Sequence, residues 1–169
     1  MTELLNTCKD TLIERKHELI SQIIKKGLCK VLRFEASSVL YYDRKEDILF
    51  SVSHDTSYDG ITFIKEVIQY PSTLGITGSV MRRTDKDVFV FHHTKKNGLY
   101  KPEIDNITGV HEVRDMVLGV LRSKKKVVGI VQLVNKNTED DGISAQDQHL
   151  IESILPVLAA GICNAHDFN

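Results

Sequence analysis

The chain has 169 residues, with 22 basic and 23 acidic side chains and a net charge of −1 at pH 7. This near balance argues against a partner held by charge, so we expect neither nucleic acid nor an anionic membrane surface. A chain of this length suits one domain that folds without disulfides. Its three cysteines are widely spaced, no apolar run has spanning length and the N-terminus is polar, so we expect a cytoplasmic protein without metal or cofactor.

Apolar residues recur at helical spacing from Leu4 to about Leu32, with charged residues between them. The second half of this segment suits a helix docked on its own sheet. The first half has a thin apolar stripe, which is typical of a helix that meets another helix across a dimer. We therefore predict a connecting and dimerisation helix over residues 1–30 and the main domain over residues 31–169.

Two short runs rich in β-forming residues follow, at 37–42 and 48–53. The polar turn between them predicts a β-hairpin. Residues 61–70 predict a further strand, although residues 65–68 also fit a helix.

A breaker cluster at 71–75 precedes a short helix at 76–83 and a short strand at 88–91. Residues 92–114 then form a long polar segment, with one helical turn expected at 102–106. Loops of this length in compact domains are commonly lids or binding loops.

Two apolar, β-branched runs at 116–122 and 127–137 are joined by a short polar connection. They predict an antiparallel hairpin at the centre of the sheet. Ser144 and Asp147 then form a capping box that opens a long helix, in which Pro156 should kink the axis or remove one hydrogen bond. This order of elements predicts an α+β domain around one antiparallel sheet.

Five short motifs occur along the chain: Gly75 to Val80, Tyr100 ahead of Asp105 to Gly109, Arg114, Gly129 to Lys136, and Gly161 to Ala165. In this order they resemble a GAF domain, specifically the cyclic-nucleotide-binding kind found in phosphodiesterases and some bacterial cyclases. The resemblance covers about residues 31–165. It implies a GAF fold, in which the terminal helices cover one face of the sheet and a ligand pocket lies under a helical lid on the other.

A further signature of this class ties the last strand to the last helix. Asn135, Lys136 and Asp147 match it, whereas Ile143 and Gln148 stand where the family has Phe and Glu. The resemblance implies an ion pair between Lys136 and Asp147. Asp147 is also the fourth residue of the capping box, and both interpretations concern architecture.

A cyclic nucleotide requires oriented donors for its phosphate and an apolar slot for its purine. Backbone N–H groups near Ile76 and Thr77, at the start of the short helix, are expected to meet the phosphate, because helix N-termini hold anions. Gly75 and Gly78 would permit close backbone approach. Alternatively, these two glycines only form a tight turn and let the helix pack on the sheet.

The resemblance implies further ligand contacts from the lid segment. Tyr100, Asp105 and Thr108 match by position, and Glu112 is the next expected contact, although the chain carries one extra residue before Arg114. The spacing of Asp105 and Thr108 also suits local capping of one turn.

The first hairpin is expected to contact the purine edge through Ser38 on its first strand and Ser53, His54 and Asp55 at the end of the second. His54 has both a donor and an acceptor and could read a purine. A lone histidine at a strand end is otherwise a solvated surface residue.

The sequence contains no nucleophile elbow, phosphate loop or paired-histidine helix motif. One enzymatic branch of the GAF fold reduces free methionine sulfoxide with pocket cysteines, but all three cysteines here fall in predicted helices. We therefore expect a regulatory domain of a larger signalling enzyme, such as a phosphodiesterase or nucleotide cyclase.

Two hypotheses follow. In the first, the chain binds cAMP or cGMP, forms a parallel homodimer through its terminal helices and controls an attached effector domain. In the second, it is a GAF-fold dimerisation module with no bound nucleotide, which the changes at Ile143, Gln148 and His54 favour.

Overall fold

The structure is a computed structural model that describes residues 17–137 and 142–166. It contains one six-stranded sheet in the order β3-β2-β1-β6-β5-β4, and every neighbouring pair is antiparallel. The strands are β1 Phe34–Asp43, β2 Ile48–Thr56, β3 Thr62–Pro71, β4 Val88–Phe91, β5 Met116–Ser123 and β6 Lys126–Lys136. The predicted α+β architecture is thus confirmed, and β6 lies at its centre.

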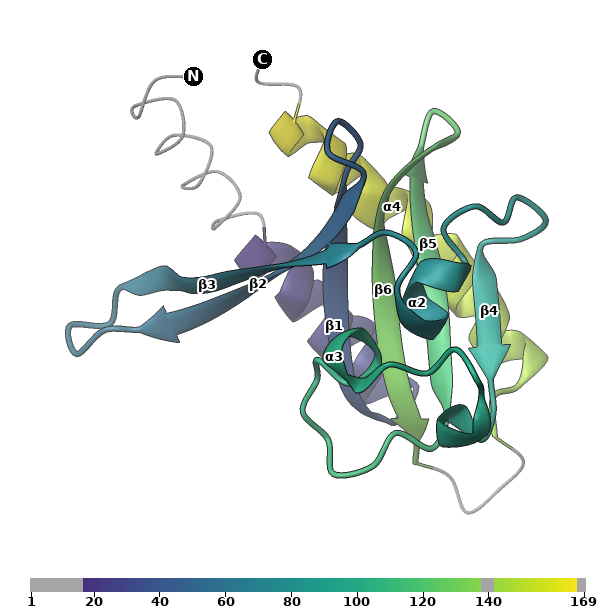
Figure 1. The fold of residues 1–169 in the computed structure, drawn as a ribbon. Coiled ribbons are helices and arrows are strands. Elements are labelled where there is room, and N and C mark those ends of the chain that lie inside the picture. Colours follow the sequence, from purple (N-terminus) through teal and green to yellow (C-terminus); the bar gives the residue numbers. More distant parts are fainter. Residues whose placement is uncertain (1–16, 138–141, 167–169) are drawn as a thin grey trace.

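Helices cover the two faces of the sheet differently (Figure 1). One face carries the N-terminal helix, which includes the π-helical segment η1 Ile24–Cys29, and the long α4 Ala145–His166. The other face carries the short helices α2 Gly75–Ser79 and α3 Pro102–Asp105. A short 3₁₀ turn, η2 Thr94–Lys96, begins the segment that leads to α3.

Side chains along each strand point alternately to the two faces of the sheet, and this produces two separate hydrophobic cores. In β6, Val131 and Leu133 face the terminal helices, whereas Ile130 and Val134 face α2 and α3. Successive strand residues point to opposite faces, so one apolar run supplies both cores. This explains why the predicted central strand reads as continuously hydrophobic.

The predicted N-terminal helix lies only partly within the described residues. From residue 17 onward it packs on the sheet, because Ile20, Ile24 and Leu28 are fully buried in the core beneath α4. The predicted dimerisation stripe falls mainly on residues 1–16, outside the described part of the chain. Dimerisation and the proposed boundary at residue 30 therefore stay predictions.

The β2–β3 hairpin extends beyond the sheet as an arm (Figure 1). Strand β2 pairs with β3 along its whole length but with β1 only over Ile48–Phe50. The helical alternative for residues 65–68 is wrong, since they lie within β3. The ladder also shifts register between Ser53 and His54, beyond the last pairing of β2 with β1 at Phe50.

Candidate functional site

The start of α2 is the part of the lid face that the sequence linked to an anion. Its N-cap residue, Leu74, provides no side-chain hydrogen bond. The first N–H groups of a helix require external acceptors. The carboxylate of Asp105, from α3, accepts from the Ile76 N–H and the Thr77 N–H, each at 2.9 Å, and from the Thr77 hydroxyl at 2.7 Å.

A fourth donor completes this cluster, because the Lys101 N–H lies 2.8 Å from the second oxygen of Asp105. Asp105 is fully buried. Gly75 makes the approach possible: its φ is +70°, and a Cβ there would lie 2.7 Å from the Asp105 carboxylate. Four donors therefore converge on a negatively charged group that belongs to the lid itself. We call Asp105 and these donors the Asp105 clamp.

Gly78 plays a different part from Gly75. A Cβ on Gly78 would stand 2.5 Å from the backbone carbon of Thr73. This close approach packs α2 against the turn that precedes it, as the tight-turn alternative expected.

Gln132, a residue that the sequence analysis did not single out, supports the clamp from the sheet. Its Nε2 donates to the Thr77 hydroxyl and to the Ile104 carbonyl, both at 2.8 Å. Its Oε1 is buried and has no hydrogen-bond partner among the residues that the structure describes. An unpaired buried acceptor is uncommon and costs free energy. The signal in the sequence was a single amide inside an otherwise apolar strand.

Other predicted lid residues lie in two different environments. Tyr100 packs against the lid-side core, and burial, with the nearby Asp105 and Glu103 carboxylates, raises the pKa of its phenol. Within the described part of the chain, the Thr108 hydroxyl contacts only the Asn106 side chain, at 3.5 Å. Of these two residues, Tyr100 is the one that lies near the Asp105 clamp.

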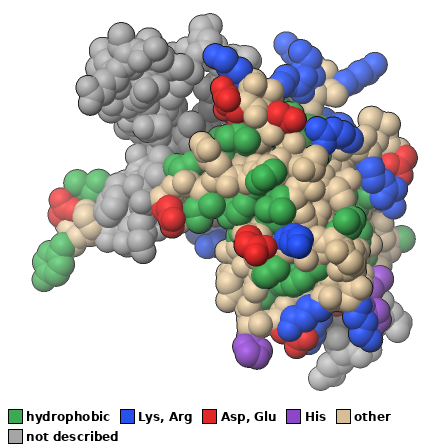
Figure 2. Space-filling model, viewed as in Figure 1, with side chains coloured by type: hydrophobic (Ala, Val, Ile, Leu, Met, Phe, Trp, Pro, Cys, Tyr) green, Lys and Arg blue, Asp and Glu red, His purple; other side chains and the backbone are tan. Residues whose placement is uncertain are grey.

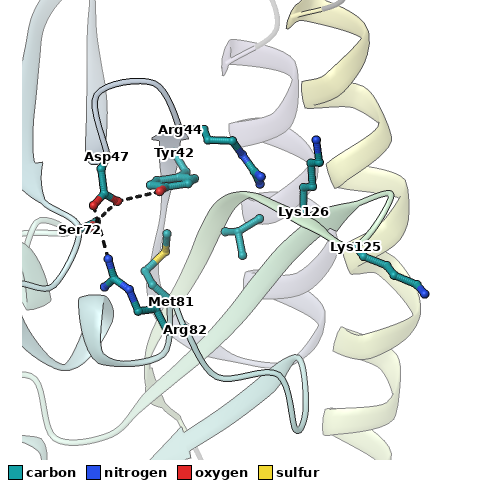
Figure 3. A pocket seen from close by; sticks show the side chains of 9 residues that line it. Tyr42, Arg44, Asp47, Ser72, Met81, Arg82, Lys125 and Lys126 are labelled. Atoms are coloured by element: carbon teal, nitrogen blue, oxygen red, sulfur yellow. Dashed lines mark hydrogen bonds and ion pairs between the residues drawn. The ribbon is translucent and has the colours of Figure 1, made fainter.

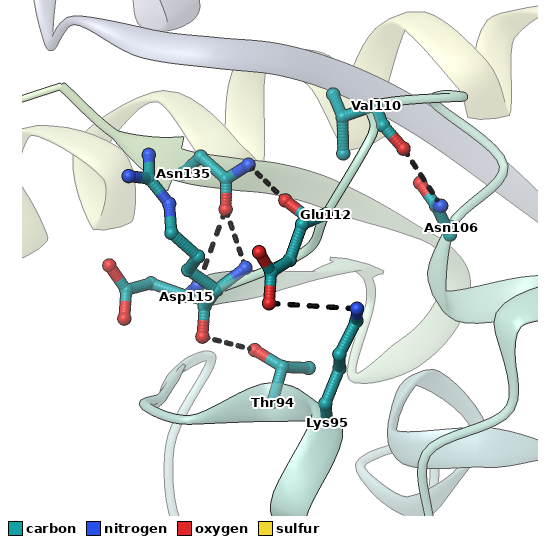
Figure 4. Close-up of polar contacts among 8 residues, drawn as sticks. Thr94, Lys95, Asn106, Val110, Glu112, Asp115 and Asn135 are labelled. Carbon is teal, nitrogen blue, oxygen red and sulfur yellow. Dashed lines mark hydrogen bonds and ion pairs between the residues drawn. The ribbon is translucent and has the colours of Figure 1, made fainter.

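Glu112 points outward, in contrast to the prediction of a ligand contact. Its carboxylate lies 3.5 Å from the Lys95 ammonium (Figure 4). The reason is that Asn135 holds the Glu112 carbonyl from the sheet side, at 2.6 Å, and the side chain turns to solvent. The extra residue before Arg114 falls in this returning segment.

Asn135 anchors the end of the lid to β6 (Figure 4). Its side chain accepts from the Arg114 N–H at 2.7 Å and donates to the Glu35 carboxylate at 2.6 Å, in addition to its bond with Glu112. It is buried and has a φ of 57°, a left-handed conformation that Asn tolerates. This geometry agrees with the structural role expected of Asn135.

Three of the four predicted purine contacts, Ser53, His54 and Asp55, are not brought to the Asp105 clamp. Ser53 lies on the arm and donates to the Glu66 carbonyl at 3.3 Å. The backbones of His54 and Asp55 pair with Ile64 and Phe63 on the same arm, and their side chains lie outside what the structure describes. The cause is the early departure of β2 from β1.

Ser38 and Ser53 also line a separate cavity of about 400 Å³. It lies between the N-terminal helix, β1 and β2, and His17 and Lys25 also line it. Ser38 is in addition the cross-strand partner of Gln132. The predicted site residues are thus divided between the Asp105 clamp, the lid segment and this cavity.

Lys136 and Asp147 form the expected ion pair at 3.1 Å, and Lys136 also donates to the Leu32 carbonyl. The capping box is present as well: the Asp147 N–H donates to the Ser144 hydroxyl, and the Ser144 N–H donates to Asp147. Burial alone would raise the pKa of Asp147, but the Ser144 N–H and the Lys136 ammonium outweigh it and lower that pKa.

Replacing Asp147 with Asn should lower the free energy of unfolding at pH 7 by about 2 kcal/mol, through loss of the cap and the ion pair. A depressed carboxyl pKa stabilises the fold above the unfolded pKa of about 3.9 and loses this effect as pH falls through the folded value. In urea unfolding, the free energy of unfolding of the native chain should exceed that of Asp147→Asn by a constant amount from pH 5 to 7. This excess should shrink below about pH 4. Glu152→Gln, at an exposed position on the same helix, is the control. If the native chain and Asp147→Asn differ in free energy of unfolding at pH 3 as much as at pH 7, this explanation is wrong.

Cysteine positions bear on the enzymatic alternative. Cys29, the last residue of η1, is buried in the core beneath the terminal helices, and Cys163 lies on α4, so both are on the face opposite the lid. Cys8 falls outside the described residues.

Within residues 17–137 and 142–166, no three His, Cys, Asp or Glu side chains are grouped as metal ligands. Nor does any helix in this part of the chain have the length and apolar character to cross a membrane.

Comparison with solved structures identifies the fold. The GAF domain of an Acinetobacter phosphoenolpyruvate-protein phosphotransferase superposes with a TM-score of 0.67 at 12% identity, covering 100% of this chain and 98% of that one. The GAF domain of a Bacillus halodurans sensor histidine kinase gives 0.61 at 19% identity, with coverage of 89% and 95%. A type II free methionine-R-sulfoxide reductase from Thermoplasma acidophilum gives 0.59 at 11% identity, with coverage of 93% and 96%.

No protein family model matches the sequence, and no curated protein matches it significantly. In this chain an antiparallel sheet carries the terminal helices on one face and a helical lid on the other. Together with the structural similarities, this shows that the chain has the GAF fold. Since similar structures include a sensor-kinase domain and a reductase, the fold by itself does not decide the function.

Proposed function

We propose that this chain is a regulatory GAF domain that senses an anionic small molecule, with cAMP or cGMP as the class of ligand. The observation that carries the proposal is the convergence of the Ile76, Thr77 and Lys101 donors on the Asp105 carboxylate. Such a cluster is chemically suited to a phosphate, which accepts the same N–H and O–H groups. The lid carboxylate then acts as an internal substitute for the ligand anion.

The same arrangement supplies a switch. A ligand phosphate that takes the donors must displace Asp105, and α3 with it, because Asp105 is the last residue of that helix. A ligand shifts such an equilibrium by its differential affinity for the two states. Movement of the lid segment would then pass through Asn135 to β6 and the terminal helices, toward a homodimer partner and an attached effector domain.

Gln132 adds a requirement on the ligand. Its unpaired Oε1 is an acceptor in the buried region next to Thr77. An amino or imino N–H of a purine could satisfy it once the lid has moved. Ser38, opposite Gln132 on β1, would lie beside the same group.

The second candidate is a dimerisation module with no bound nucleotide. It is favoured by the completeness of the Asp105 clamp, in which all four donors already have a charged acceptor. In that case the Asp105 clamp only holds the lid in place, and no nucleotide binds at the start of α2.

Thermal unfolding with cAMP, cGMP, AMP or no ligand distinguishes the two, for the native chain and for Asp105→Asn. At a hundredfold excess over its dissociation constant, a ligand stabilises the native state by about 2.7 kcal/mol. We expect a midpoint shift with one cyclic nucleotide, and a larger shift for Asp105→Asn, because a neutral amide holds the closed lid less well.

Glu103→Gln is the matched control, since Glu103 is an exposed carboxylate in the same short helix. The ligand should shift the unfolding midpoint of Glu103→Gln by as much as it shifts that of the native chain. If no cyclic nucleotide raises the midpoint of the native chain or of Asp105→Asn near millimolar concentration, the dimerisation module stands.

A further inference from the structure

We propose that the chain has a second anion site, which takes the phosphate or pyrophosphate group of a small molecule. It lies where three turns meet at one end of the sheet: the β1–β2 turn, the β5–β6 turn and the turn after α2. Figure 2 shows Lys and Arg side chains gathered at the end of the molecule where the first two turns lie in Figure 1. This site is independent of the proposed nucleotide sensing.

The turns enclose a cavity of about 240 Å³ with an unbalanced charge. Arg44, Arg82, Lys125 and Lys126 line it, and Asp47 is the only carboxylate among the described residues of its lining. Arg44, Lys125 and Lys126 have no ion-pair partner among the residues that the structure describes. In a chain whose charges nearly cancel, this excess of positive charge is local.

Asp47 fixes the walls of the cavity and, among the described residues, forms an ion pair with one of its four cations, Arg82 (Figure 3). It accepts from the Tyr42 hydroxyl at 2.7 Å and the Ser72 hydroxyl at 2.9 Å, so it ties β1 to the segment before α2. Its contact with Arg82 is long, at 3.4 Å. The guanidinium of Arg82 therefore retains donors that can face a ligand.

The side chains converge from separate elements. Figure 3 shows Arg44, from the β1–β2 turn, directed across the cavity toward the hairpin that carries Lys126, while Lys125 extends outward at the rim. Arg binds phosphate oxygens in bidentate fashion, and Lys adds a point charge. Two guanidinium groups and an ammonium belong to the lining of this cavity, with the Arg82 guanidinium turned toward Asp47, and such a set matches a multiply charged oxyanion.

The β5–β6 turn has an unusual backbone. Lys124 and Lys125 both have left-handed φ values, 51° and 67°. Two-residue hairpin turns of this kind favour Asn-Gly, and a lysine in this conformation costs about 1 kcal/mol. Lysines occupy this turn although the conformation is unfavourable for them, and the ammonium of Lys125 lies at the cavity.

The size of the cavity limits the ligand. A volume of about 240 Å³ is below the roughly 300–1,000 Å³ typical of sites for drug-sized molecules. It suits one phosphate or pyrophosphate group better than a whole nucleotide. An extended acidic segment would need a longer groove.

Isothermal titration calorimetry of the full chain with inorganic pyrophosphate, at low ionic strength, tests the proposal. The double variant Arg44→Gln with Lys126→Gln should weaken binding at least about tenfold, since it removes two charge-assisted contacts. The matched control is Lys45→Gln with Lys124→Gln, which removes two exposed charges from the same turns but not from the cavity lining. It should change the affinity by less than about threefold, through screened long-range charge alone.

Three results would overturn the proposal: no heat of binding with the native chain, equal weakening in both double variants, or stronger binding of a short polyglutamate peptide than of pyrophosphate. Asp105→Asn separates the two anion sites. An unchanged pyrophosphate affinity in that variant supports the second site, whereas loss of binding would assign the heat to the lid.

Discussion

Replacing Asp105 with Ala is expected to lower the free energy of unfolding by about 4 kcal/mol. The variant leaves the N–H groups of Ile76 and Thr77 buried without an acceptor, and each unsatisfied buried donor costs about 1–3 kcal/mol. The part-buried N–H of Lys101 also loses its acceptor. It also opens a small cavity beside Ile104. Urea or guanidinium unfolding of the purified chain measures the loss.

Glu103→Ala, in the same helix, is the control and should stay within about 0.5 kcal/mol of the native value, because Glu103 is exposed. A loss below about 1 kcal/mol for Asp105→Ala would mean that the four hydrogen bonds are not formed in solution.

Replacing Asn135 with Ala is the second large effect, and we expect a loss of about 3 kcal/mol. The variant leaves the Arg114 N–H and the Glu112 carbonyl without their partner and places a Cβ-bearing residue without a polar side chain at φ 57°. The lid segment should then detach from β6. Chemical unfolding gives the magnitude, and hydrogen exchange over residues 110–115 shows the location.

Asn135→Gly separates the two contributions, because glycine adopts the left-handed conformation freely. It should lose about 1 kcal/mol less than Asn135→Ala. Asn137→Ala, exposed and two residues further along, is the control and should be near neutral. Equal losses for all three variants would rule out the anchoring role.

Sequence patterns predicted the main elements of the fold because their signals are local. The capping box of Ser144 and Asp147 and the breaker cluster before α2 depend on neighbours a few residues apart. The two β-branched runs of the central hairpin were equally clear. The ion pair of Lys136 with Asp147 followed from the family resemblance, and the structure contains it.

Contacts between distant segments could not be predicted in the same way. Asp105 was expected to touch a ligand or to cap its own turn. It does accept from the Lys101 N–H at the start of α3, but it also caps α2, some 28 residues earlier in the chain. The arm of β2 and β3 was missed because nothing in the sequence fixes where β2 leaves β1. The predicted placement of Ser53, His54 and Asp55 at one pocket depended on that register.

Two groups of residues in the proposed sites escaped the sequence analysis. Gln132 was read as part of an apolar strand, although a lone amide there is the kind of polar residue that must find partners. Arg44 and Lys126 were treated as ordinary polar turn residues. Their convergence depends on the sheet order, which places the β1–β2 and β5–β6 turns at the same end.

The central claim is that a ligand anion replaces the Asp105 carboxylate at the start of α2. Two-dimensional ¹H–¹⁵N NMR of the labelled chain tests it directly, through the amide signals of Ile76, Thr77 and Lys101 during titration with cAMP and cGMP. The account predicts that all three signals move together and saturate with one of these nucleotides. If they stay fixed while the nucleotide binds elsewhere, or if no signal moves, the claim is contradicted.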